Sequence, residues 1–116
     1  MAQSIVQVDA FTDRPFGGNP AAVCVLDRER DEALMQPVAL EINLSQTAFP
    51  LRSGDDWNLR WFTPAAEVEL CGHATLGTAK VLFVDDYVPA DATIRFHTRS
   101  GVLTARADGD YIVLNF

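Results

Sequence analysis

Residues 71–84 read Cys71-Gly72-His73-Ala74-Thr75-Leu76-Gly77-Thr78-Ala79-Lys80-Val81-Leu82-Phe83-Val84. From Ala74 to Val84 this stretch is apolar nearly all round, which is typical of a helix that is buried on every side. A chain of 116 residues can bury such a helix by wrapping a curved sheet around it. We therefore expect a barrel-like sheet with residues 74–84 at its centre.

Segments with strand character lie on both sides of this helix. Their branched and aromatic residues alternate with polar ones or form short apolar runs, as in β-strands. The expected strands cover residues 5–11, 21–26, 47–51, 57–61, 67–70, 93–99, 102–107 and 111–116. Tight hairpin turns are expected at Ser100-Gly101 and Asp108-Gly109. Residues 13–20 hold two prolines and two glycines, which predicts a turn or a loop whose backbone approaches a ligand.

A second helix is expected between Asp31 and Asn43. Asp31 can cap its start, and Leu34, Val38 and Ile42 recur at four-residue spacing on one face. Pro37 conflicts with this pattern, because a proline inside a helix removes a hydrogen bond and costs about 3 kcal/mol. We expect the regular part of the helix to follow Pro37.

The order of elements predicts the fold class. It runs strand, strand, helix, two or three strands, buried helix, three strands, which indicates an α+β domain with an antiparallel, barrel-like sheet around one hydrophobic helix. By its length the chain is expected to form a single domain over residues 1–116.

Composition narrows the class of partner. A net charge of −7 and a pI near 4.5, with basic residues scattered along the chain, argue against nucleic acid, because phosphate binding needs clustered Lys and Arg. No apolar run reaches the roughly 20 residues of a membrane span, and the first residues lack the pattern of a signal peptide. Two cysteines make no disulfide framework. We therefore expect a soluble, cytoplasmic protein.

Candidate chemistry gathers where the central helix opens. The unpaired N–H groups of a helix start, together with the helix dipole, suit a carboxylate, and Gly72 lets a ligand approach the backbone. Thr75 can add a hydroxyl donor. The positive end of the helix disfavours imidazolium, so His73 can stay neutral and move protons near pH 7. Alternatively, His73 only caps or packs at the helix start.

Two further readings of these residues concern metal and the end of the first helix. Cys71 and His73 have no spaced Cys or His partner, and the other histidine is His97 in an expected strand, so we expect no metal site. Ser45, Gln46 and Thr47 can aim polar side chains at a neighbouring pocket, or simply terminate the helix. Gln46 carries an amide, which cannot act as a general base.

Four stretches of the sequence carry a resemblance to a known family: residues 8–12 with 16–20, residues 35–36 with 43–49, residues 59–64 and residues 67–75. Together they resemble the phenazine-biosynthesis PhzF-like family, which shares its fold with diaminopimelate epimerase. The resemblance implies a cofactor-independent isomerase of two lobes, each a barrel-like sheet around a helix, with helix N-termini gripping a substrate carboxylate in the cleft. The family prototype isomerises trans-2,3-dihydro-3-hydroxyanthranilate by moving a proton.

The resemblance implies roles for individual residues. His73 would handle the proton, and Gln46 stands where the family carries a catalytic Glu. The match covers one N-terminal lobe, so we expect the second lobe to be absent and the chain to form a homodimer or to pair with a second lobe; alternatively, the chain is a fragment. The residues expected to bind the substrate are Gly72, Ser45, Asn19, Cys71, Ala74 and Thr75.

Three functions stay open at this point. The leading one is an isomerase lobe acting on a small, cyclic carboxylic acid in a biosynthetic pathway. A Cys-dependent epimerase or racemase would use Cys71 as its thiol, although Cys71 can equally be a small buried residue. The third is a degenerate lobe that binds a small acid without catalysis, or only dimerises.

Overall fold

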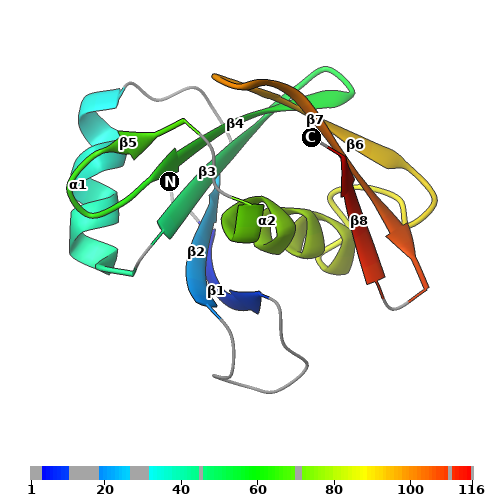
Figure 1. Cartoon of the computed structure of the whole chain (residues 1–116), viewed down its shortest axis with the longest axis horizontal. Helices are drawn as coiled ribbons and strands as arrows, with labels where there is room; N and C mark the ends of the chain where they lie inside the picture. The colour runs from blue at the N-terminus through cyan, green and yellow to red at the C-terminus, as the bar shows by residue number, and fades with distance from the viewer. Residues whose placement is uncertain are drawn as a thin grey trace.

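The computed structural model describes residues 4–10, 19–26, 32–44, 46–69, 72–109 and 111–115. Eight strands and two helices follow one another in nearly the expected order, and Figure 1 shows the sheet curling around one of the helices. None of the described helices is long and apolar enough to cross a membrane. The elements are β1 (Ser4–Ala10), β2 (Asn19–Val25), α1 (Glu32–Ile42), β3 (Gln46–Ser53), β4 (Asp56–Phe62), β5 (Glu67–Val68), α2 (Gly72–Val84), β6 (Thr93–Thr98), β7 (Gly101–Asp108) and β8 (Tyr111–Asn115).

The sheet is mixed, so the expectation of an antiparallel sheet was wrong in part. Its strand order is β1-β2-β3-β4-β6-β7-β8, with β5 paired to β4. The pairs β2–β3 and β4–β6 are parallel, and the other pairs of described strands are antiparallel. The cause is the helices: α1 lies between β2 and β3, and α2 between β4 and β6. Helix α1 returns the chain to the end where β2 began, so β3 runs the same way as β2. The short β5 and α2 together return the chain to the end where β4 began, so β6 runs the same way as β4.

The two faces of the sheet bury different helices. Because side chains alternate along a strand, one set of residues packs around α2 and the other set packs against α1. The α2 side holds the larger core, which includes Val23, Ala48, Trp57, Trp61, Leu82 and Phe96. The α1 side holds a smaller cluster of Cys24, Leu26, Met35, Ala39, Phe49 and Phe62.

The central helix is open along one stripe rather than buried on every side, as the sequence had suggested. Seven of its residues, from Ala74 to Leu82, are buried. Lys80 and Val84 are exposed, and His73, Leu76 and Phe83 are half-buried. These five recur at three- and four-residue spacing and so share one face. The reason is that the sheet curls without closing: β1 and β8 stand at opposite ends of the strand order, and α2 contacts both.

Helix α1 differs from its sequence-based prediction in two respects. It is continuous from Glu32 to Ile42 with Pro37 inside it, so the expectation of a regular part only after Pro37 was wrong. Its buried face is shifted by one residue: Met35 and Ala39 are 5% and 0% exposed, whereas Leu34 is 50% exposed. Pro37 lies on the exposed side, where its ring does not disturb the contact with the sheet.

Candidate functional site

Three chain segments meet at one end of the sheet, where α2 begins. β2 and β3 run parallel with Ala21 opposite Gln46, so both strands begin at this end. β4 runs antiparallel to β3 and therefore finishes there. The start of α2 lies beside these strand ends in Figure 1, and α2 contacts β1, β2 and β3.

A buried hydrogen bond ties the first turn of α2 to β4. The indole Nε1 of Trp61 donates to Oγ1 of Thr75 at 2.9 Å, and the two residues are 1% and 0% exposed. Trp61 stands opposite Ala48 in the ladder, two residues along the same face of β3 from Gln46. The opening of α2 and the beginning of β3 are thus neighbours on one side of the sheet.

His73 is the second residue of α2 and Gly72 the first, and both are half-buried. Burial lowers the pKa of His73 below its ordinary value of 6.5, because desolvation disfavours the charged ring. A lowered pKa favours the neutral imidazole at pH 7, and the cause is burial, whereas the sequence had suggested the helix dipole. A neutral ring can accept a proton from a bound molecule.

Gln46 is the first residue of β3, and its side chain shares the α2 side of the sheet with Ala48. Its Oε1 atom is buried and has no hydrogen-bond donor within the described part of the chain. A buried carbonyl without a donor is destabilising. A bound molecule carrying a donor would relieve that cost.

The other expected binding residues are placed unevenly. Ala74 and Thr75 are fully buried in the first turn of α2, and Thr75 accepts the Trp61 bond there. Asn19 is the first residue of β2, opposite Ala10; its side chain lies outside the described residues, as do Ser45 and Cys71. Contact of any of them with a substrate stays a prediction.

Within the described ranges, no three His, Cys, Asp or Glu side chains gather as a metal site would require. His97 is exposed and lies 2.8 Å from the Asp56 carboxylate, far along the sheet from His73. It therefore belongs to a surface hydrogen bond with Asp56 rather than to the chemistry at α2.

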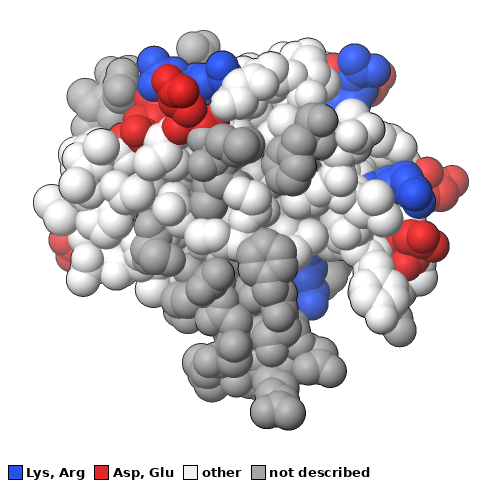
Figure 2. Space-filling model, viewed as in Figure 1, with Lys and Arg blue, Asp and Glu red and all other residues white. Residues whose placement is uncertain are grey.

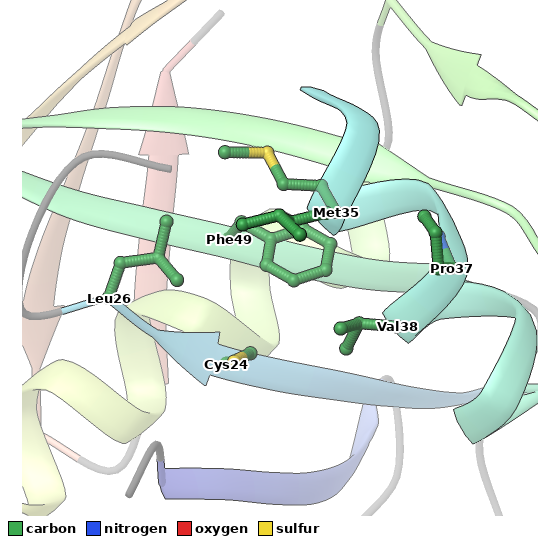
Figure 3. A pocket seen from close by; sticks show the side chains of 7 residues that line it. Cys24, Leu26, Met35, Pro37, Val38 and Phe49 are labelled. Carbon is green, nitrogen blue, oxygen red and sulfur yellow. The ribbon is translucent and has the colours of Figure 1, made fainter. Parts of the chain in front are cut away.

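A separate pocket lies on the other face of the sheet, between α1 and strands β2 and β3 (Figure 3). Its volume is about 370 Å³, and its walls are almost wholly apolar. Such walls offer no partner to a carboxylate. We therefore do not place the candidate site there. The lining residues are Cys24, Leu26, Leu34, Met35, Pro37, Val38 and Phe49.

Sequence reasoning missed the contacts that hold this end of the fold together. It read Trp61 as part of an aromatic strand face and Glu67 as one member of an alternating strand. Glu67 does lie in a strand, β5, and its carboxylate also accepts two hydrogen bonds from Arg60. A partial signal existed for Trp61, because a buried indole N–H usually finds a partner. The sequence did not single out Thr75 as that partner, since Thr63 and Ser53 carry hydroxyls nearer along the chain.

Comparison with known proteins agrees with this fold. The family model for the phenazine biosynthesis-like protein, PhzC-PhzF, matches residues 8–113. An uncharacterized isomerase of Halalkalibacterium halodurans is 53% identical over the whole chain, which spans 44% of that protein. A PhzF-family phenazine biosynthesis protein from Enterococcus faecalis has a TM-score of 0.90 and 47% identity over 97% of this chain and 43% of its own.

A predicted epimerase from Pseudomonas aeruginosa is more distant, with a TM-score of 0.77 and 26% identity over 96% of this chain and 41% of its own. The fold thus has epimerase-like neighbours too. The chain spans less than half the length of each of these relatives. With a family model that covers almost all of its residues and relatives above 50% identity, the chain belongs to the phenazine biosynthesis-like PhzC/PhzF family.

Proposed function

We propose that this chain forms a lobe of a PhzF-like isomerase that binds a small carboxylic acid and moves a proton on it. One observation carries the proposal: His73 stands at the opening of α2, half-buried and with a lowered pKa, beside the beginning of β3. Family membership supports the reaction class, since the Halalkalibacterium halodurans relative is named an isomerase.

Each part of the site has a chemical task. The N–H groups in the first turn of α2 bind the substrate carboxylate, and Gly72 leaves room for it against the backbone. Neutral His73 takes a proton from one carbon and returns it to another. One C–H bond breaks and one forms, and no electrons leave the substrate, so the step is balanced without a cofactor or co-reactant.

Gln46 takes a different part from a carboxylate at the same position. Its amide donates and accepts hydrogen bonds but does not take up a proton near neutral pH. We assign it to holding the substrate. A further proton-handling group would come from a partner lobe, either a second copy of this chain or another part of a longer protein. A clean monomer mass in light scattering at micromolar concentration would exclude the homodimer.

Binding without catalysis is the second candidate, and Gln46 is the observation that favours it. Such a lobe would hold a small acid at the start of α2 without exchanging its protons. The thiol mechanism through Cys71 makes a different prediction: iodoacetamide at neutral pH would alkylate Cys71 and abolish turnover. An inert Cys71 excludes it.

The deciding experiment follows trans-2,3-dihydro-3-hydroxyanthranilate in heavy water by NMR, with the wild-type chain and with Gln46→Glu. Turnover with deuterium entering the product supports a native isomerase. Turnover by Gln46→Glu alone supports the binding lobe, because the missing group is then the base. His97→Asn serves as the matched control, since His97 pairs with Asp56 away from α2; it should leave any turnover unchanged, whereas His73→Asn should remove it.

A further inference from the structure

Shortly before the first residue of α2, the sequence carries a glutamate, Glu67, whose carboxylate is nearly buried. The Glu67 side chain is only 5% exposed. Arg60 grips it with two bonds, Nε to Oε2 at 2.7 Å and Nη2 to Oε1 at 2.6 Å, and Arg99 adds a third at 3.1 Å. Burying a carboxylate costs several kcal/mol unless charged partners satisfy it, and a bidentate guanidinium is the partner that does so best. The arrangement is therefore a built cluster and not a chance surface pair.

This cluster joins three parts of the fold. Arg60 belongs to β4, Glu67 to β5, and Arg99 to the turn between β6 and β7. The same turn forms a second bond two residues after Glu67, where Ser100 Oγ donates to the carbonyl of Glu69 at 2.7 Å. Acidic and basic side chains gather over this corner of the molecule in Figure 2. Glu67 and Glu69, which precede α2 in the chain, are thus each bonded to the turn between β6 and β7.

Two neighbouring residues of β4 form hydrogen bonds to residues on either side of the start of α2. Arg60 binds Glu67, and Trp61 binds Thr75. Neighbouring side chains of a strand point to opposite faces, so the Arg60 bond is made on one face of β4 and the Trp61 bond on the other. Between the two anchors lie Gly72 and His73.

We propose that Glu67, held by Arg60 and Arg99, is a positioning residue that fixes the opening turn of α2 against the end of β4. The effect of Glu67 on ligand affinity rests on the function proposed above. Its effect on the position of the first turn of α2 does not. If the cluster only stabilised the fold as a whole, its loss would loosen every part of the molecule alike. A positioning role loosens the start of α2 more than the rest.

The two buried indoles separate these cases within one protein. Trp61 Nε1 reports the contact between β4 and the start of α2. Trp57 Nε1 is also buried, at the opposite end of the same strand, and serves as the internal reference. We would label both indoles with ¹⁵N and measure their hydrogen exchange in the wild type, in Glu67→Gln and in Asp108→Asn. The last variant is the matched control, because Asp108 forms an exposed ion pair with Arg106 at the end of β7 and lies outside β4.

Glu67→Gln should speed exchange of the Trp61 indole about tenfold relative to that of Trp57, given the strength of charge-assisted bonds. Asp108→Asn should leave the ratio at the wild-type value. Equal acceleration of both indoles, or no change in either, overturns the proposal. If Glu67→Gln does not fold, Arg99→Met removes only the outer, half-exposed arm and should shift the same ratio in the same direction by less; an unchanged ratio there overturns the proposal as well.

A second measurement tests the consequence for binding. Anthranilate, a stable cyclic carboxylic acid, would be titrated while the amide signals of Gly72 and His73 are followed. Weaker binding by Glu67→Gln than by Asp108→Asn supports the positioning role at the proposed site. If the wild type does not bind anthranilate, the result counts against the proposed function. The ratio of indole exchange rates still tests the positioning of α2.

Discussion

Replacing Trp61 with Phe removes the indole N–H that anchors the first turn of α2 to β4. Trp61 is 1% exposed and its partner Thr75 is 0% exposed, so the bond is made away from water. A neutral hydrogen bond contributes about 1 kcal/mol net. The smaller ring also leaves a cavity, which brings the expected loss for Trp61→Phe to about 2–3 kcal/mol.

Thr75→Val keeps the shape of the side chain but deletes the acceptor. The Trp61 N–H is then buried without a partner, which costs about 1–3 kcal/mol. Thr75 takes part in further contacts, so neither single variant isolates this bond. The double variant does, because the coupling energy of a double-mutant cycle leaves out what each residue does alone. We expect a coupling of about 1 kcal/mol.

The assay is urea unfolding of the four proteins followed by far-UV circular dichroism, since removing Trp61 changes the fluorescence. On heating, each 1 kcal/mol should appear as a fall in Tm of about 4 °C for a domain of this size. Thr75→Ser retains the hydroxyl and should retain most of the coupling. A coupling within 0.3 kcal/mol of zero, a threshold near the limit of such measurements, would refute the idea that this bond anchors α2.

Three other perturbations test the core, α1 and His73. Leu82→Ala, at a fully buried position of α2, should cost about 2–5 kcal/mol in urea unfolding; a loss below 1 kcal/mol would contradict the packing around α2. Pro37→Ala should stabilise the chain by about 1–2 kcal/mol, because it restores a backbone N–H inside a continuous helix; lower stability would mean that α1 depends on the proline. Burial lowers the pKa of His73 below 6.5, so its contribution to stability is present above that pH and is lost as the pH falls through the lower value of the folded state. Between pH 7.5 and 5.5 the wild type should therefore lose more stability than His73→Gln, and equal losses would count against a buried neutral ring.

Local patterns predicted the elements, but long-range partners decided how these elements pair. The hairpin turns followed from Gly101 and Gly109, whose φ angles of +99° and +61° suit glycine best. The directions of β3 and β6 depended instead on the helices that precede them. In α1, Leu34 and Met35 are equally apolar, so composition alone could not tell which of two adjacent faces meets the sheet.

The residues of the candidate site also differ in whether local sequence could identify them. His73 and Gly72 were identified because a glycine at the start of a helix has a local signature. Arg60 and Glu67 lie seven positions apart, and Arg99 lies 32 positions beyond Glu67, so their meeting depends on the completed sheet. A carboxylate in an alternating strand predicts exposure in general, and the charged hydrogen bonds from Arg60 and Arg99 offset the cost of burying Glu67.

Position 46 links the chemistry of the site to the stability of the fold. Its side chain points to the α2 side, and its Oε1 is buried without a donor in the described part of the chain. A carboxylate there would lose hydration, which raises its pKa and suits it to proton transfer near neutral pH. The same burial makes the folded state hold its proton more tightly than the unfolded state, whose value is about 4.3, so the stability of Gln46→Glu should fall as the pH rises above that value. The amide of Gln46 avoids this loss but gives up proton transfer. Urea unfolding of Gln46→Glu and of the wild type at pH 5 and pH 8 measures this loss. If the free energy of unfolding of the variant falls no more than that of the wild type between the two pH values, position 46 is well solvated. The amide then gives no advantage in stability over a carboxylate.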